Sequence, residues 1–403
     1  MSVNQSYPLT GVKILDLTRV LAGPLCTQYL GDLGAEIIKI ENPKGGDDTR
    51  AWGPPFLGTE SAYYLGINRN KKSICLDIKA KEGFKILKDL IKKSDVVIDN
   101  FKPGFWNKIG LPDNWFNKNV QNVVRTSISG YGVKGPQGGL PGYDFLMQAE
   151  SGLMKITGEV NGEPMKLGVA IVDIVTGLNA VISVLSGLLL NKKIKNKNIL
   201  TEVNLYNSGI FLLANVASNT LVSNKDAERY ANGHPNIVPY NLFKSKNGEL
   251  AISVGNDNQF KIFTKLLKKP EWATDKRFAK NADRVKNRTL IEKMINKELS
   301  KKNRSYWYNL FLKNNIPSAI VRGVKEALNH PQTKDNDMTL KLDKKNTKTL
   351  ETLNTPIQIN NQRGLSKPKY PPTLGEDTKK VLKNILNIDD GEIKKLISLN
   401  VIK

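Results

Sequence analysis

The sequence is poor in the side chains that bind metals and form disulfides. Its 403 residues include only two cysteines and two histidines. Cys26 and Cys75 have no CxxC partner, and His234 and His330 stand far apart in the chain. This distribution argues against a zinc site and against a disulfide framework, and it is typical of a reducing compartment. We therefore expect a cytoplasmic protein without a metal.

Long hydrophobic runs are also scarce. The longest, at 180–190, is shorter than the roughly 20 residues that a membrane-spanning helix needs. The first residues, MSVNQSYPLTG, lack the charged start and apolar stretch of a secretion signal. With 39% hydrophobic residues, the composition is that of a folded globular protein. We expect no membrane partner.

Acidic residues are few compared with basic ones. The chain has 38 Asp and Glu against 61 Lys and Arg, which gives a formal net charge of +23. Such a charge could indicate nucleic-acid binding. However, lysine occurs together with asparagine, as in NKKIKNKN at 191–198, and no helix-turn-helix, zinc-finger or RNP pattern is present. We interpret the charge as a compositional bias that suits a polyanionic small ligand, and we expect no nucleic-acid partner.

The first third of the chain alternates between two hydrophobic patterns. Short aliphatic and β-branched runs predict strands, and segments with apolar residues on one helical face predict helices. This alternation indicates a parallel α/β sheet, whose ligands bind at the carboxyl ends of the strands. The expected strands are 11–17, 35–41, 73–78, 95–101 and 122–129, and the expected helices are 24–33 and 81–93.

Several charged or glycine-rich motifs allow more than one interpretation. The segment GYGVKGP (130–136) matches G-x-G-x-x-G, but the proline that follows prevents the helix that a dinucleotide fingerprint must open. We expect a loop that can approach a ligand closely, and no NAD or FAD. Glu41 could bind a ribose hydroxyl or simply end a strand in solvent. Arg69, Lys71 and Lys72 could neutralise a phosphate or form a solvated cluster.

One carboxylate stands in a long apolar segment. Asp173 lies in GVAIVDIVTGLNAV, where apolar residues at helical spacing begin. Serine-hydrolase chemistry is disfavoured, because no G-x-S-x-G motif and no histidine in a triad context occur. Two interpretations of Asp173 remain open. It could cap the helix, which is worth about 1 kcal/mol, or it could be a covalent nucleophile that the helix N-terminus keeps ionised.

A series of segments resembles one known family along nearly the whole chain. The sequence is similar to the family III CoA-transferases of the CaiB/BaiF type, which include formyl-CoA and carnitine CoA-transferases and α-methylacyl-CoA racemases. Within the family, LTRVLAGP and GGDDTRAWGPPFLGTESAYYL look most like the succinyl-CoA-dependent dicarboxylate transferases of the glutarate type. The other matching segments are LGDLGAEIIKIENPKGGDDTR, NRNKKSI, DNFKPG, SISGYGVKGP, GYDFLMQAESGLMKITG, GVAIVDIVTGLNAV, HPNIVPYNLF and PPTLGEDT.

The resemblance implies a CoA-transferase that moves CoA from an acyl-CoA donor, such as succinyl-CoA, to a carboxylic acid acceptor. Asp173 falls on the family's nucleophile, which passes through an aspartyl mixed anhydride and an enzyme–CoA thioester. An acyl-CoA racemase of the same fold is the alternative. Racemases of the family carry a histidine where this chain has Tyr143. Because tyrosine ordinarily titrates near pH 10, it is a poor acid/base partner at neutral pH, and racemisation is disfavoured.

The resemblance also implies where CoA binds, as a substrate and not as a permanently bound cofactor. Asn42 stands where many members have an arginine, which puts one phosphate contact in doubt. The implied contacts are Val20, Leu21, Ala22, Asn42, Leu76, Asp77, Ile78, Lys79, Asn100, Phe101, Lys102, Lys108, Leu140, Pro141, Gly142 and Tyr143.

The fold implied by the resemblance has a large domain built from both chain ends. This Rossmann-like parallel α/β domain would hold residues 1–195 and 355–403 and bind CoA. A smaller central α+β domain would hold residues 226–325, with linkers at 196–225 and 326–354. Two such chains would thread through each other as an interlocked homodimer. The hydrophobic pattern of the sequence also changes near residue 226. Beyond it, the segment NLFKSKNGELAISVGND (241–257) predicts a hairpin.

Overall fold

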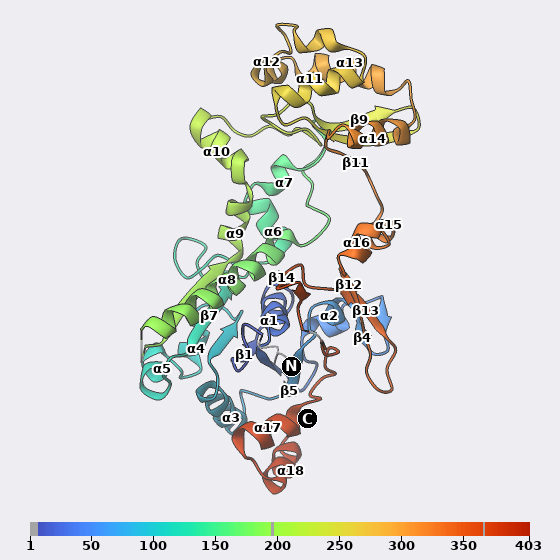
Figure 1. Ribbon diagram of the computed structural model, residues 1–403. Coiled ribbons are helices and arrows are strands. Elements are labelled where there is room, and N and C mark those ends of the chain that lie inside the picture. The colour runs from blue at the N-terminus through green and yellow to red at the C-terminus, as the bar shows by residue number, and fades with distance from the viewer. Residues whose placement is uncertain (1–6, 195–196, 366) are drawn as a thin grey trace. The chain divides into compact units, whose positions relative to one another are not determined.

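The computed structural model describes residues 7–194, 197–365 and 367–403 (Figure 1). The chain forms two compact units. The first comprises Met1–Leu153, Leu167–Leu212 and Pro331–Lys403, and the second comprises Met154–Lys166 and Leu213–His330.

A six-stranded parallel sheet lies at the centre of the first unit, as the alternating pattern predicts. The strand order is β5-β2-β1-β6-β7-β8, and every neighbouring pair is parallel. The α/β architecture with a parallel sheet is therefore confirmed. The strands are β1 (Lys13–Leu17), β2 (Glu36–Glu41), β5 (Lys71–Cys75), β6 (Val96–Asp99), β7 (Val124–Ser129) and β8 (Ile199–Asn204).

Helices cover both faces of this sheet, because neighbouring residues of each strand point to opposite sides. Ile14 and Ile37 pack with helices α1 (Ala22–Asp32) and α8 (Ile171–Lys193). Leu15 and Ile38, one residue further along, pack with α3 (Lys81–Lys92), α17 (Thr378–Leu386) and α18 (Asp390–Ser398). The C-terminal helices thus share a hydrophobic core with the first strands.

Helix α8 crosses α1 at a close contact. A Cβ atom added to Gly177 would lie 2.7 Å from the carbonyl oxygen of Ala22, so only glycine allows this approach. Helix α8 is also long and apolar enough to cross a membrane, which the 11-residue run at 180–190 had not suggested. Core helices of globular proteins meet the same criterion, and α8 packs against β7 and β8.

Residues 197–225, where we expected a linker, carry regular structure. They hold β8, α9 (Leu205–Leu212) and α10 (Ala214–Ser223). Strand β8 was missed because it pairs only with β7 and alternates between exposed and half-buried residues beside the Lys/Asn-rich segment. The second expected linker also contains secondary structure, namely α15 (Val324–Leu328), α16 (Pro331–Asp335), β12 (Thr339–Leu342) and β13 (Leu350–Leu353).

Shorter elements complete the first unit. They are η1 (Asp48–Ala51), β3 (Phe56–Leu57), β4 (Glu60–Ser61), α2 (Ala62–Gly66), α4 (Phe105–Lys108), α5 (Asp113–Asn119), α6 (Asp144–Glu150), β14 (Gln358–Ile359) and β15 (Gln362–Arg363). Helix α7 (Leu153–Ile156) follows α6.

The second unit contains an antiparallel sheet with the strand order β11-β10-β9. The expected hairpin is confirmed: β9 and β10 pair across a turn at Asn247. Phe243, Phe260 and Phe311 belong to the core of this unit. Its elements are β9 (Tyr240–Ser245), β10 (Gly248–Ser253), α11 (Asp257–Leu266), η2 (Pro270–Ala273), α12 (Asn281–Lys286), α13 (Arg288–Leu299), α14 (Arg304–Lys313) and β11 (Ser318–Ile320).

Candidate active site

A pocket of about 670 Å³ lies in the first unit, at the carboxyl ends of β1, β6 and β7. This is the edge at which parallel sheets bind ligands. Its walls come from the loops that follow those strands, from the segment 140–143 and from the start of α8. The lining residues are Arg19, Val20, Leu21, Ala22, Asn100, Phe101, Lys102, Pro103, Gly104, Phe105, Lys108, Ile128, Ser129, Gly130, Leu140, Pro141, Gly142, Tyr143, Asp173 and Leu205.

The pocket brings together Asp173 and many of the residues that the family resemblance implies. The segments 20–22, 100–102 and 140–143 and the side chain of Lys108 all line it. The remaining implied contacts lie outside the lining. Leu76 is buried in the core, Ile78 packs against it, and Asp77, Lys79 and Asn42 are not among the wall residues.

Other wall residues escaped the sequence analysis. Ser129 ends β7, Leu205 directly follows β8, and Arg19 lies two residues beyond β1, so their position at a strand end was the signal available. Leu205 could not be recognised because β8 itself was missed. Gly130 and Gly142 touch each other: a Cβ on Gly142 would lie 2.6 Å from the Cα of Gly130. The glycine-rich segment therefore folds back on itself at the pocket wall.

Asp173 is the third residue of α8 and lines the pocket. Among the described residues, its carboxylate has no hydrogen bond or ion pair. Burial, together with the nearby negative charge of Asp144, raises the pKa of Asp173 to about 7. Burial and the charge of Asp144 thus oppose the ionisation of Asp173 that we expected the helix N-terminus to favour.

The cap of α8 is Asp144 and not Asp173. Oδ1 of Asp144 accepts the backbone N–H of Val172 at 2.7 Å and that of Asp173 at 3.2 Å. The amide of Gln148 donates to Oδ2 at 2.6 Å, which fixes the carboxylate. The helix-capping interpretation of Asp173 is therefore wrong, since the carboxylate that serves the helix end belongs to a residue 29 positions earlier.

A tyrosine lies within electrostatic reach of both carboxylates. Burial, followed by the charges of Asp173 and Asp144, raises the pKa of Tyr63 to about 12, so its hydroxyl stays protonated at neutral pH. The Tyr63 ring packs edge-on against Trp52, with centroids 5.4 Å apart. Nothing in the spacing of the sequence marked Tyr63, which follows Ser61, the N-cap of the short helix α2.

The remaining charges of the pocket wall are positive. Lys102 and Lys108 are exposed and belong to the loop after β6 and the short helix α4. Arg19 forms an exposed ion pair with Asp48 at 3.0 Å, a type of contact that contributes little stability and is easily exchanged. A polyanion that carries an acyl group would find cations here together with the unpaired carboxylate of Asp173.

The basic residues that precede β5 are neither a solvated cluster nor a phosphate site. Arg69 pairs with Asp32 in the interior, and the fully buried Lys71 reaches Asp16 at 3.3 Å. Lys72 pairs with Glu36 across the sheet surface. Each cation has a structural partner, which corrects both interpretations.

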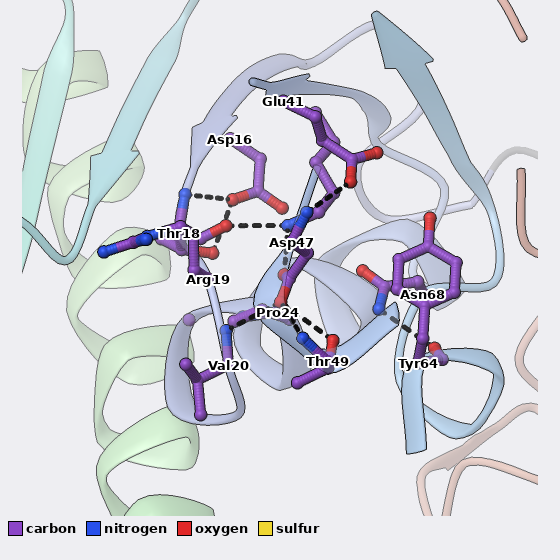
Figure 2. A network of polar contacts seen from close by, with 12 residues as sticks. Asp16, Thr18, Arg19, Val20, Pro24, Glu41, Asp47, Thr49, Tyr64 and Asn68 are labelled. Atoms are coloured by element: carbon purple, nitrogen blue, oxygen red, sulfur yellow. Dashed lines mark hydrogen bonds and ion pairs between the residues drawn. The ribbon is translucent and has the colours of Figure 1, made fainter. Parts of the chain in front are cut away.

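Glu41 is buried as well, so neither interpretation of this residue holds. It accepts Nε and Nη2 of Arg50 at 2.8 and 2.7 Å and the hydroxyl of Ser73 at 2.6 Å. Figure 2 shows Glu41 beside Asp47 in a network of polar side chains at the ends of β1 and β2. Within the described residues, no group of three His, Cys, Asp or Glu side chains is arranged to hold a metal.

Comparisons with known proteins agree on one family. The family described as CoA-transferase family III matches residues 9–378. The chain is 39% identical to the succinyl-CoA:glutarate CoA-transferase of Homo sapiens over 400 residues, which cover 99% of this chain and 91% of that protein. It is 36% identical to the succinate–glutarate CoA-transferase of Agrobacterium fabrum, with 96% and 98% covered.

A solved structure is similar over the same length. The crystal structure of a CaiB/BaiF family protein from Brucella suis superposes with a TM-score of 0.82 at 35% identity, and it covers 94% of this chain and 100% of that chain. The pocket therefore belongs to a fold shared with that family. The chain belongs to CoA-transferase family III and is a CoA-transferase.

Proposed function

We propose that the enzyme moves CoA from a dicarboxylyl-CoA donor, such as succinyl-CoA, to a carboxylic acid, and that Asp173 carries the acyl and CoA groups in turn. One observation carries this proposal. Asp173 is an unpaired, largely buried carboxylate in a pocket whose other charged side chains are Arg19, Lys102 and Lys108. A carboxylate without a structural partner is free to act as a nucleophile.

The first half of the reaction exchanges the donor acid for the enzyme. The ionised carboxylate of Asp173 attacks the thioester carbonyl, the C–S bond breaks, and a mixed anhydride and CoA thiolate form. The thiolate then attacks the side-chain carbonyl of Asp173. This step releases the donor acid as a carboxylate and leaves an enzyme–CoA thioester.

The second half repeats these steps with the acceptor. The acceptor carboxylate attacks the enzyme thioester, which gives a new anhydride and frees the thiolate. The thiolate attacks the acyl carbonyl of the acceptor, so acceptor-CoA leaves and Asp173 regains its carboxylate. No proton is gained or lost in the cycle.

The pocket wall offers donors for the negative oxygens that form in these steps. Helix α1 has no side-chain cap, and Leu21 and Ala22 at its start line the pocket. Backbone N–H groups at a helix N-terminus bind anions and stabilise developing oxyanions. Lys102 and Lys108 supply the charge that the phosphates of CoA require.

The choice of a dicarboxylate donor rests on similarity. The proteins from Homo sapiens and Agrobacterium fabrum are named for succinate or succinyl-CoA and for glutarate. Their alignments with this chain are nearly full-length, so they include every residue of the pocket wall. We therefore expect short dicarboxylates as acceptors too.

The direct test incubates the enzyme with succinyl-CoA and a panel of acids that includes glutarate, and identifies new CoA thioesters by mass. The matched control is Asp173→Asn, which keeps the shape of the side chain and removes the nucleophile. We expect glutaryl-CoA from the wild-type enzyme and none from the variant. Absence of any new thioester with every acid would contradict the proposal.

We also propose the assembly and location that the family resemblance implies, namely an interlocked homodimer in the cytoplasm with a large domain built from both chain ends. Exposed apolar side chains of the first unit support an interface, with Phe211 77% exposed and Ile182 61% exposed. Light scattering coupled to size exclusion tests this proposal. A mass equal to one chain at micromolar concentration would contradict the dimer.

A further inference from the structure

A residue of the pocket wall has a strained backbone. Val20 lies in the loop between β1 and α1 with φ of 74°, in the left-handed region. β-branched residues rarely adopt this conformation, because their Cβ substituents clash with the backbone. Such strain persists only where the surrounding structure imposes it.

Side chains from three places hold the backbone that leads into Val20, from the Thr18 carbonyl to the Val20 N–H. Lys39 donates through Nζ to the carbonyl oxygen of Thr18 at 2.7 Å, and the N–H of Val20 donates to Oδ1 of Asp47 at 3.2 Å. The side chain of Asn100 binds the backbone of Arg19, which lies between Thr18 and Val20. Its Oδ1 accepts the N–H of Arg19 at 3.0 Å, and its Nδ2 donates to the Arg19 carbonyl at 2.7 Å. Figure 2 shows Thr18, Arg19 and Val20 around Asp47.

Lys39 and Asp47 form a single buried unit beneath this loop. Their Nζ and Oδ2 atoms lie 2.9 Å apart, and neither side chain is exposed to solvent. Oδ1 of Asp47 also accepts the N–H and the hydroxyl of Thr49. Lys39 is the direct neighbour of Asp16 in the sheet, and Asp16 accepts the N–H of Thr18 at 2.9 Å.

A buried ion pair of this kind is weak evidence for stability, because removing two charges from water costs about as much as their attraction returns. Neither Lys39 nor Asp47 lines the pocket. The pair instead contacts the loop between β1 and α1, which forms part of the pocket wall. Ala22, just beyond that loop, is the residue against which Gly177 packs, one turn of α8 from Asp173.

We propose that the Lys39–Asp47 ion pair is a positioning element for CoA transfer: it imposes the left-handed turn at Val20 and thereby sets the N-terminus of α1 relative to Asp173. This inference rests on the proposed function. Lys39 and Asp47 act through the loop and do not touch the reacting atoms. Asn100, which the resemblance implied as a CoA contact, has its side-chain amide engaged by the same loop.

The charge of Asp47, and not only its shape, is required. Oδ1 serves Val20 and Thr49, while Oδ2 faces the Lys39 ammonium. An asparagine has one acceptor oxygen, so in either orientation its NH₂ group faces a donor. Asp47→Asn should therefore release one side of the loop while it preserves the volume of the interior.

The test compares Asp47→Asn with Asp32→Asn. Asp32 forms an equally buried ion pair with Arg69 at the far end of α1, and it contacts no residue of the pocket wall. Both variants should lower the melting temperature. For Asp47→Asn we expect kcat/KM for succinyl-CoA to fall on the order of tenfold to a hundredfold, because the displaced loop would misalign the substrate with Asp173. For Asp32→Asn we expect kcat/KM to stay within about twofold of wild type. Equal effects of the two variants on kcat/KM would overturn the proposal.

The variant Val20→Gly distinguishes an effect on the conformation of residue 20 from a general loss of stability. Glycine adopts the left-handed conformation without support, so the loss caused by Asp47→Asn should shrink when Val20→Gly is also present. A loss of the same factor in both backgrounds would show that the pair does not act through Val20, and the proposal would fall.

Hydrogen exchange distinguishes this failure from a failure of the proposed function. If wild-type enzyme transfers no CoA, the function is refuted, but exchange of the amides of residues 18–22 still reports on the loop. We expect faster exchange of these amides in Asp47→Asn and wild-type exchange in Asp32→Asn. Unchanged exchange in Asp47→Asn would refute the positioning role whatever the activity.

Discussion

The carboxylate of Asp144 accepts the backbone N–H of Asp173 at 3.2 Å, and through the same oxygen it accepts the N–H of Val172. One carboxylate thus stabilises the start of α8, and its charge adds to the burial that raises the pKa of the other. An ionised Asp173 is costly in this place. In the proposed mechanism, conversion of Asp173 to an anhydride or thioester would remove this charge.

We predict that Asp173→Asn stabilises the protein while it abolishes transfer. Because the pKa of Asp173 is raised in the folded state, its ionisation opposes folding, and the penalty grows as pH rises from the unfolded value of about 4 through about 7. Removing the carboxyl should raise the unfolding free energy on the order of 1–2 kcal/mol at pH 8, since the group is partly exposed to the pocket. At pH 4 the gain should vanish.

Thermal unfolding of the wild type and of Asp173→Asn at pH 4, 6 and 8 checks this prediction. Asp144→Ala serves as a comparison that should be destabilised. Asp144→Ala removes the cap of α8 and should cost about 1 kcal/mol. A lower melting temperature for Asp173→Asn at pH 8 would mean that the Asp173 carboxylate supports the fold.

We predict that the donor half-reaction depends on the ionised form of Asp173. kcat/KM for succinyl-CoA, which reports on the free enzyme, should rise with pH, reach half its maximum near pH 7, and level off above pH 8. Asp144→Asn removes a like charge and should move the midpoint to lower pH. A profile that is flat from pH 5 to 8, or a midpoint unmoved by Asp144→Asn, would contradict this account.

Much of the site followed from the sequence because its parts are local. Strands such as AEIIKIE, and the loops that follow them, place the pocket at the carboxyl ends of a parallel sheet. A further signal was available there: Lys39 lies in a strand that a parallel sheet buries on both faces, so it needed an acidic partner. That the partner is Asp47 could not be predicted, because it depends on how the next loop folds back.

Other parts required the tertiary structure. The role of Asp144 depends on the packing of α6 against the start of α8, and no local pattern reveals which of two aspartates caps a helix. The amide of Asn100 turns to the Arg19 backbone, which its position after β6 does not fix. Strand β8 was hidden because an edge strand with alternating exposure lacks the continuous apolar run of the central strands.

We predict that Lys102 and Lys108 bind the phosphates of CoA. Lys102→Ala and Lys108→Ala should each raise KM for CoA thioesters about two- to tenfold, with kcat little changed, because an exposed lysine contributes modest uniform binding. The effect should weaken as salt concentration rises. Lys85→Ala, on the exposed face of α3 and outside the pocket wall, is the control. An equal change of KM in the control would show that only net charge matters.

We predict that the enzyme does not exchange the α-proton of a 2-methylacyl-CoA. Racemisation needs two groups that titrate near neutral pH on opposite sides of the α-carbon, and no histidine is among the residues that line the pocket. The family resemblance implies that Tyr143 stands where the racemases carry a histidine. Incubation in D₂O followed by mass analysis of the thioester checks this. Deuterium incorporation at a rate similar to CoA transfer would restore the racemase alternative.

The most direct test of the central claim is intact-protein and peptide mass spectrometry of enzyme incubated with succinyl-CoA and no acceptor. The account predicts a CoA adduct on the peptide that contains Asp173, its disappearance when glutarate is added, and its absence in Asp173→Asn. Rapid transfer to glutarate with no adduct on Asp173, or with an adduct on another residue, would contradict the account.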